Sequence, residues 1–347
     1  MVSFPTLPVG HAGALNPHRD MAPGSMVRRH APTLPLRVGT RGSPLALFQT
    51  RLFLSMITRF CPLMRQMNAF EEHQITTSGD KVQDRALAEV GGKGLFAKEI
   101  HEAMLERRID FAVHSLKDLE TRLPPGIVLA CTLRREDPRD AMVFGPACGE
   151  GSDADPFAAL PKGALVGTAS VRRQAQLLYR RPDIRCEMIR GNVGTRLGRV
   201  RRGDFDASLL AVAGLNRLEL SHEVGAVIAP DIMLPAVCQG IIGVTVREDD
   251  VELCELLSAL EDAESRAVSL AERALQHALD GSCRTPMGGY ATRQPDGSLR
   301  LIGLVARADG SFLLQREVTG SPRDAEAMGR DLGLSLKRDA PDDIFAE

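Results

Sequence analysis

Strand-like and helix-like segments alternate along this chain from Leu36 onward, and this alternation constrains the fold more than any other feature of the sequence. The run LRVGT at 36–40 is typical of a buried strand, and the next segment, 41–60, has apolar residues at helical spacing. Ser43 suits the N-cap of this helix, and Pro44 suits its first position, where a missing N–H costs nothing. Strands that alternate with helices predict a layered α/β protein.

The chain is long enough for several cores. With 347 residues, it suits two or three domains better than one. A second α/β series begins near Arg139, and a last unit begins near Ala263 with an amphipathic helix, a hairpin turned at Asp309 and Gly310, and a closing helix. We therefore predict three compact units of unequal size.

Residues 1–35 differ from the rest because they are rich in Pro, Gly and His and show no hydrophobic periodicity. They lack the apolar core and the small-residue cleavage site of a secretory signal. We expect a disordered extension, or a start codon that lies upstream of the true one, for which Met21 and Met26 are candidates. Scattered arginines leave a transit peptide open as a third interpretation.

Composition argues against several classes of function. The formal net charge of −2 gives no general attraction to nucleic acid, and 4% aromatic residues with no Trp provide few stacking surfaces for bases. No apolar run reaches the roughly 18 residues of a membrane span. The seven cysteines are widely spaced without a C-x-x-C pair, which argues against a disulfide framework or a zinc site. We expect no metal, no nucleic-acid partner, no membrane partner and a reducing, cytoplasmic location.

The segment VHSLKDL at 113–119 follows an apolar strand and places a His, a Ser, a Lys and an Asp where that strand ends. In open α/β sheets, ligands bind at the carboxyl ends of strands. Asp118 is expected to stay ionised beside Lys117, able to stabilise a cation or to transfer a proton. A Ser–His nucleophile is disfavoured because Ser115 lacks the G-x-S-x-G pattern. The alternative interpretation is a solvated turn.

Ten arginines and no lysine lie between Ser170 and Asp204. A planar guanidinium matches a carboxylate or a phosphate, so this choice favours bidentate recognition of anions. The segments GTASVRRQ and RGNVGTR each follow a strand and open a helix, so two helix N-termini would meet at one cleft. The residues that we assign to this cleft are Thr168, Ser170, Arg172, Arg173, Arg190 and Arg196. We interpret four other arginines as solvated residues at helix ends: Arg180, Arg181, Arg201 and Arg202.

Two further segments carry reactive side chains. GGKGLFAKE at 91–99 places Lys93 where an anion could be covered, although it lacks the spacing of a P-loop and by itself indicates a flexible surface loop. ALDGSCRTP at 278–286 places Cys283 just past a predicted helix, whose negative C-terminal end disfavours a thiolate. Such a thiol could still attack a strongly electrophilic carbon, and the product would be a lasting thioether.

Together these segments resemble the porphobilinogen deaminase (hydroxymethylbilane synthase) family. The resemblance covers about residues 36–335 and is carried, in the family's order, by GTRGSPLAL, GGKGLF, VHSLKDL, REDPRDA, VGTASVRRQAQL, RGNVGTRL, LAVAGLNRL, LPAVCQG, AERA and GSC. It implies an α/β fold with two periplasmic-binding-protein-like lobes and a smaller α+β C-terminal domain. The ranges that we predict are 1–35 for the extension, 36–138 with 236–260 for domain 1, 139–235 for domain 2 and 261–347 for domain 3.

The resemblance also implies a reaction and a cofactor. A dipyrromethane, built by the enzyme from its own substrate, is held through a thioether at Cys283. Four porphobilinogen molecules are added head to tail with loss of ammonia, and water releases hydroxymethylbilane. An arginine-lined cleft suits a growing chain whose every unit carries acetate and propionate. A fixed anion at Asp118 suits the cationic methylene that loss of ammonia leaves.

Individual residues carry over to this chain by motif. Asp118 is the implied catalytic residue. The residues implied to bind the cofactor are Cys283, Arg41, Ser43, Ser115, Lys117, Thr168, Ser170, Arg172, Arg173 and Arg190. The residues implied to bind substrate are Arg41, Arg173, Arg196, Gln239 and Lys93, the last of them in the family's mobile loop. We expect a cytoplasmic monomer whose partner is the small molecule porphobilinogen.

Four positions depart from the family's usual pattern: Ala169 replaces a serine, Glu120 a proline, and Cys238 and Ser282 each a glycine. None of these changes removes a charged catalytic group, so we expect activity to be kept. An anion-binding protein without catalysis is the alternative from another class. The placed Cys283 and the acidic Asp118 argue against it.

Overall fold

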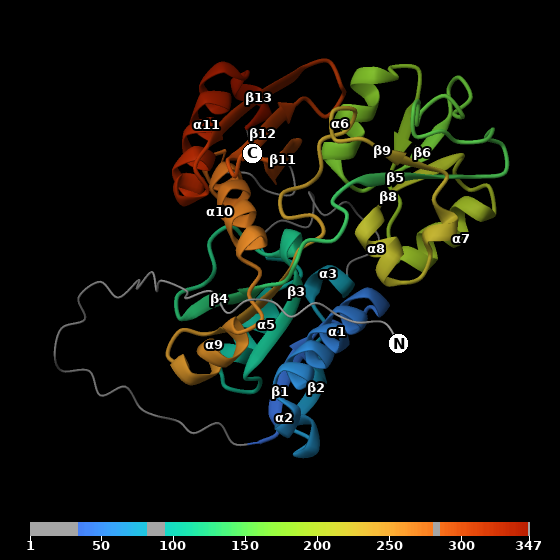
Figure 1. The fold of residues 1–347 in the computed structure, drawn as a ribbon. Coiled ribbons are helices and arrows are strands. Elements are labelled where there is room, and N and C mark those ends of the chain that lie inside the picture. Colours follow the sequence, from blue (N-terminus) through green and yellow to red (C-terminus); the bar gives the residue numbers. More distant parts are fainter. Residues whose placement is uncertain (1–33, 82–93, 280–284, 346–347) are drawn as a thin grey trace, which may run out of the picture. The chain divides into compact units, whose positions relative to one another are not determined.

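A computed structural model describes residues 34–81, 94–279 and 285–345, which form three β-sheets with helices packed on them (Figure 1). Two of these sheets have five strands and the third has three. The predicted α/β class is therefore confirmed, with two α/β lobes and a smaller α+β unit near the C-terminus. Within the described ranges, no helix is long and apolar enough to cross a membrane.

The first sheet has the strand order β2-β1-β3-β10-β4. Its strands are β1 (Leu36–Thr40), β2 (Phe70–Gln74), β3 (Phe111–Ser115), β4 (Ile127–Thr132) and β10 (Ile242–Arg247). β1 runs parallel to β2 and β3, whereas β10 runs antiparallel to β3 and β4. The helical elements of this part of the chain are α1 (Pro44–Phe60), α2 (Pro62–Gln66), α3 (Ser78–Lys81), α5 (Lys98–Leu105), η1 (Leu116–Asp118) and α9 (Val251–Ser258).

The second sheet, with the order β7-β6-β8-β5-β9, repeats this pattern. Its strands are β5 (Asp140–Phe144), β6 (Leu165–Gly167), β7 (Arg185–Glu187), β8 (Ala207–Ala211) and β9 (Ala226–Ile228). β6 runs parallel to β7 and β8, and β5 runs antiparallel to β8 and β9. The accompanying helices are α6 (Val171–Arg180), α7 (Val193–Arg201), α8 (Val212–Arg217) and η2 (Ser221–Glu223). The repeat is visible in the topology, although the sequence shows no internal repeat.

The chain passes from the first sheet to the second at 133–139 and returns at 229–241. Each crossing leads directly into an antiparallel strand, β5 on the way out and β10 on the way back. The strands of each sheet fall within one of the predicted domain ranges. The boundaries themselves stay a prediction.

The third sheet is the antiparallel meander β11 (Met287–Arg293), β12 (Leu299–Ala306) and β13 (Leu313–Gly320). The helices α10 (Ala263–Ala278) and α11 (Ala325–Asp339) pack against it (Figure 1), and η3 (Pro322–Asp324) and η4 (Asp342–Ile344) complete this part. Leu275 of α10 and Leu301 of β12 share one buried core with Leu116 and Leu119, which flank Asp118. Burying each such leucine contributes about 1.5–3 kcal/mol, so this core holds the Asp118 turn against the third unit.

The first predicted helix, α1, begins as its sequence indicates. Ser43 is the N-cap and accepts a hydrogen bond from the backbone N–H of Ala46 at 3.3 Å, and a proline follows it. The face that the helix buries includes Phe53 and Ile57, and Gln49 is buried beside them. A second apolar stripe, with Phe48 and Leu52 exposed by 37% and 36%, faces away from the sheet.

Candidate active site

A cleft of about 700 Å³ is lined by residues of both α/β lobes. Its walls include side chains that follow the carboxyl ends of parallel strands, as expected for an α/β sheet. The predicted site residues that line it are Arg41, Ser43, Ser115, Lys117, Asp118, Arg173, Arg190 and Arg196. The tertiary structure therefore brings together eight side chains that the motifs had singled out separately.

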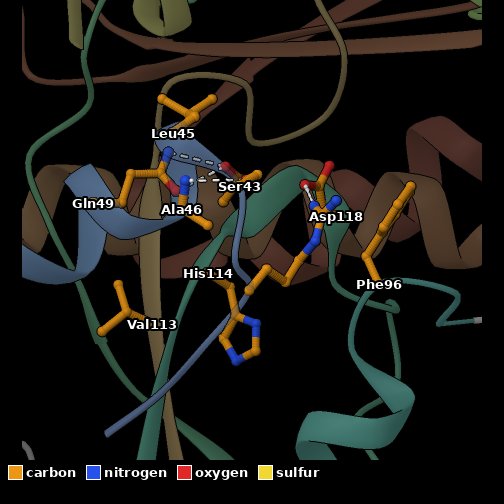
Figure 2. A pocket seen from close by; sticks show the side chains of 10 residues that line it. Ser43, Leu45, Ala46, Gln49, Phe96, Val113, His114 and Asp118 are labelled. Atoms are coloured by element: carbon orange, nitrogen blue, oxygen red, sulfur yellow. Dashed lines mark hydrogen bonds and ion pairs between the residues drawn. The ribbon is translucent and has the colours of Figure 1, made fainter. Parts of the chain in front are cut away.

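Asp118 ends the turn η1, and its carboxylate pairs with Arg41. Oδ2 of Asp118 lies 3.5 Å from Nη1 of Arg41. Arg41 also donates to both carboxylate oxygens of Asp80, at 2.5 and 3.3 Å, and its guanidinium carbon lies 4.2 Å from the ring centre of Phe96. Figure 2 shows Asp118 and Phe96 beside the small pocket that these residues line. The ion-pair partner of Asp118 is thus Arg41 and not Lys117, which the sequence had suggested.

Lys117 points its ammonium group toward the segment 229–241, which returns from the second sheet to the first. Its Nζ donates to Oε1 of Gln239 at 3.2 Å. Desolvation, and next the charge of Arg173, lower the pKa of Lys117 to about 8. The side chain is nevertheless exposed to the open cleft, and solvent there limits this shift. Lys117 therefore offers a positive charge that an anionic ligand would stabilise.

The fully buried Asp140 fixes the arginines at the start of α6. Its Oδ1 accepts hydrogen bonds from Nη2 of Arg173 at 2.7 Å and from Nε2 of Gln239 at 2.9 Å. Its Oδ2 lies 2.8 Å from Nη1 of Arg172. Desolvation opposes ionisation of Asp140, but the two guanidinium groups together hold its pKa far below the usual range. This carboxylate therefore sets where Arg173 enters the cleft.

Arg196 of α7 lines the cleft on the side of the second lobe. Its Nε donates to the carbonyl oxygen of Gly191 at 2.9 Å. Desolvation, followed by the charges of Arg173 and Arg190, lowers the pKa of Arg196 to about 10. The guanidinium groups of Arg173, Arg190 and Arg196 line the same cleft and so form a positive region that carboxylates of a ligand would neutralise.

The remaining predicted residues fall into two groups. Four are described by the structure but do not line the cleft, namely Thr168, Ser170, Arg172 and Gln239. Thr168 and Ser170 cap the start of α6, Arg172 donates to the carbonyl oxygen of Leu234 at 2.7 Å, and Gln239 braces Lys117 and Asp140. The two others, Lys93 and Cys283, lie outside the described residues. The binding roles of these six, like those of the eight residues that line the cleft, stay predictions.

Among the lining residues that sequence reasoning did not predict, three are Gln49, Asp80 and Arg217. Gln49 donates to Oγ of Ser115 at 2.9 Å, and Asp80 holds Arg41. Arg217 donates to the carbonyl oxygen of Gly240 at 2.7 Å, and desolvation lowers its pKa to about 10. Arg217 could have been found from the sequence, because it lies in the motif LAVAGLNRL. It was missed because it lies outside the arginine-rich segment 170–204.

Two of the departures from the family pattern have structural consequences. Cys238 is buried and does not line the cleft, and its φ of 58° places it in the left-handed region that favours glycine. Glu120 turns its carboxylate inward, where Oε2 lies 3.9 Å from Nδ1 of His101. Burial raises the pKa of Glu120. The turn that carries Asp118 is formed despite the replacement of proline by Glu120.

Two buried histidines lie behind the cleft. His101 of α5 and His114 of β3 have ring centres 5.8 Å apart and are exposed by only 2% and 6%. His114 interacts with Oγ1 of Thr245 at 2.9 Å, whereas neither ring nitrogen of His101 has a hydrogen-bond partner among the described residues. Burial lowers the pKa of His101 to about 4 and that of His114 to about 3. Both rings are therefore neutral at physiological pH.

We expect these histidines to make the fold sensitive to acid. An unfolded histidine has a pKa of about 6.5, so below that pH the unfolded chain binds protons that the folded chain excludes. Their contribution to stability is complete above pH 6.5 and is lost as the pH falls toward the folded pKa values. When the pH falls from 7 to 5.5, each of the two rings should lower the free energy of unfolding by about 1 kcal/mol.

Urea unfolding at both pH values measures this effect. In the variant His101→Leu, the loss of unfolding free energy between pH 7 and 5.5 should be smaller than in the unmodified protein by about that amount. The control is His222→Leu, at an exposed position beside Glu223, which should not reduce the loss of unfolding free energy between the two pH values. An unaltered pH dependence in His101→Leu would contradict the assignment of a neutral buried ring.

Comparison with known proteins gives a consistent result. The model of the family "Porphobilinogen deaminase, dipyromethane cofactor binding domain" matches residues 36–255, and that of "Porphobilinogen deaminase, C-terminal domain" matches 267–338. The porphobilinogen deaminase of Paracoccus denitrificans is 46% identical, over 92% of this chain and 99% of that protein. The chloroplastic porphobilinogen deaminase of Oryza sativa subsp. japonica is 44% identical, over 89% of this chain and 85% of that protein.

Among solved structures, similarity is found to a putative periplasmic sulfonate-binding protein, SsuA, from Methylobacillus flagellatus KT. It has a TM-score of 0.36 and 13% sequence identity, and the match covers 69% of this chain and 66% of that one.

Proposed function

This chain belongs to the porphobilinogen deaminase family, and we propose that the arginine-lined cleft is the place where it carries out the family's reaction as a transferase. That reaction joins four porphobilinogen molecules head to tail on a dipyrromethane cofactor, releases ammonia and forms hydroxymethylbilane. The observation that carries the proposal is the ion pair of Asp118 with Arg41 at the edge of a cleft whose other wall holds Arg173, Arg190 and Arg196.

The residues of the cleft fit the dipyrromethane cofactor by their chemistry. Desolvation, followed by the charges of Arg173 and Arg190, lowers the pKa of Arg196, so a nearby carboxylate of a dipyrromethane would stabilise its charged form. When bound, the cofactor supplies the pyrrole carbon on which the chain is extended. We propose that Ser43, Ser115, Lys117, Arg173 and Arg190 hold it, with Thr168, Ser170 and Arg172 positioning the start of α6.

For substrate, we propose that Arg41, Arg173 and Arg196 bind the acetate and propionate groups, with Gln239 orienting Lys117 and with Lys93 as an additional contact. Each guanidinium can bind a carboxylate through two parallel hydrogen bonds, which fixes orientation as well as charge. Asp118 then stabilises the cationic methylene that forms as ammonia leaves. A preorganised charge of this kind contributes about 3–4 kcal/mol to lowering a barrier.

We propose Cys283 as the attachment point of the cofactor. The support from the described residues is the position of α10, the helix that precedes it. In the last turn of α10, Nε2 of His277 accepts hydrogen bonds from Arg122 at 3.1 and 2.7 Å. Arg122 lies four positions after Asp118 in the sequence. The chain therefore leaves α10 next to the segment that carries the proposed catalytic carboxylate.

The finer aspects of location and assembly are proposals as well. We propose a monomer that acts in the cytoplasm. The support is that the six cysteines among the described residues are unpaired, which suits a reducing compartment.

Intact-protein mass spectrometry tests the proposed function. The purified protein should be heavier than its polypeptide by an adduct of two pyrrole units, and peptide mapping should place that adduct at Cys283. The same measurement under native conditions should show one subunit. An anion-binding protein without catalysis would show the bare chain mass, and that result would overturn the proposal.

A further inference from the structure

Arg273, in the C-terminal half of α10, contacts the backbone that immediately follows Asp118. Its Nη2 donates to the carbonyl oxygen of Glu120 at 2.6 Å and to that of Thr121 at 3.0 Å. No carboxylate among the described residues forms an ion pair with it. One guanidinium nitrogen thus bridges two successive carbonyl groups, across more than 150 positions of sequence.

The surroundings of Arg273 show that this contact is built into the fold and is not a surface contact. The side chain is half-buried, and desolvation lowers its pKa, opposed in part by the charge of Glu120. On the same helix, Leu275 packs in the core that also contains Leu116 and Leu119, the residues on either side of Asp118. Keeping a guanidinium desolvated has a free-energy cost, which the two hydrogen bonds offset.

We propose that Arg273 is a positioning residue for the reaction, which holds the backbone after Asp118 in the register that turnover requires. Leu116 and Leu119 fix the turn by apolar packing, which resists separation but is weakly directional. Hydrogen bonds depend on direction, so the two that Arg273 donates fix the positions of the Glu120 and Thr121 carbonyl groups relative to α10. The inference rests on the role proposed for Asp118. Arg273 itself does not line the described cleft.

The test compares Arg273→Met with Arg266→Met. Methionine keeps the apolar stem but cannot donate. Arg266 is the control, because it lies on α10 and also donates to a backbone carbonyl, that of Leu129 in β4 at 3.1 Å, outside the segment that follows Asp118; unlike Arg273, it also pairs with Glu261. In Arg273→Met, kcat per adduct-carrying molecule should fall about 100-fold, the effect of misplacing a reacting group by about 1 Å, with KM changed less than about threefold. In Arg266→Met, kcat should stay near normal, and Arg273→Lys should recover part of the loss.

A double variant separates positioning from general destabilisation. If Arg273 acts through Asp118, the variant Asp118→Asn, Arg273→Met should be no slower than Asp118→Asn alone. A folded, adduct-carrying Arg273→Met with normal kcat, a folded Arg273→Met without adduct, or a double variant much slower than Asp118→Asn would each overturn the inference. If Arg273→Met does not fold, Arg273→Lys against Arg266→Lys gives the same comparison. Failure of the proposed function is a different result: no adduct on the unmodified protein.

Discussion

Replacing Cys283 with alanine is expected to give a folded protein that carries no pyrrole adduct and has no turnover. The physical reason is that the thioether proposed at this position is the only covalent link between the growing chain and the protein. Without a tether, each new unit would have to be held by the cleft's guanidinium groups alone. Tethering can be worth about 7–11 kcal/mol of barrier, because it makes each addition effectively unimolecular.

Intact mass and a turnover assay, together with thermal unfolding to show that the variant is folded, measure this outcome. The control is Cys238→Gly, which removes a buried thiol outside the cleft and places glycine at a backbone φ of 58° that glycine favours. This control should keep both adduct and turnover. An adduct or normal turnover in Cys283→Ala would refute the attachment role and with it the proposed function.

Replacing Asp118 with asparagine is expected to keep the adduct and to lower kcat by about 10²–10³-fold, the cost of removing one preorganised electrostatic partner. Asparagine has nearly the same shape but no charge, so Arg41 loses its ion pair while its contacts with Asp80 and Phe96 remain. Because Arg41 and the other arginines that we propose to bind carboxylates are unchanged, KM should change much less than kcat.

Single-turnover kinetics on the adduct-carrying variant checks this expectation. The matched control is Asp137→Asn, which removes a carboxylate that pairs with Arg139 at 2.6 Å and does not line the cleft. It should have near-normal kcat. If Asp118→Asn also had near-normal turnover, the electrostatic role would be wrong, although the cleft could still be a binding site.

Local features of the fold were predictable because they depend on residues close together in the chain. Ser43 and Pro44 mark the start of α1 as expected, and Ser170 caps α6, accepting from the backbone N–H of Arg173. The hairpin turned at Asp309 and Gly310 is also present, as β12 and β13. In each case the signal is a capping, turn or periodic pattern within a few positions.

The same locality explains what could not be predicted. On α1, Phe53 and Ile57 form the buried face while Phe48 and Leu52 are exposed, although both stripes have helical spacing. Helical periodicity predicts which residues share a face of the helix, but it does not predict which of these faces the sheet covers. The pairing of β10 with β3 and β4 likewise joins segments more than a hundred positions apart, and no local pattern encodes it.

The sequence by itself was enough to predict the chemistry of the site: guanidinium groups for carboxylates, an acidic residue after a strand, and a thiol past a predicted helix. Only the tertiary structure decided which of these groups meet. It gave Asp118 the partner Arg41 in place of its neighbour Lys117, and it turned Arg172 toward Asp140 and Leu234 while Arg173 reaches the cleft. The physical reason is that a side chain's type sets what it can bind, whereas its partner is set by how distant strands and helices pack.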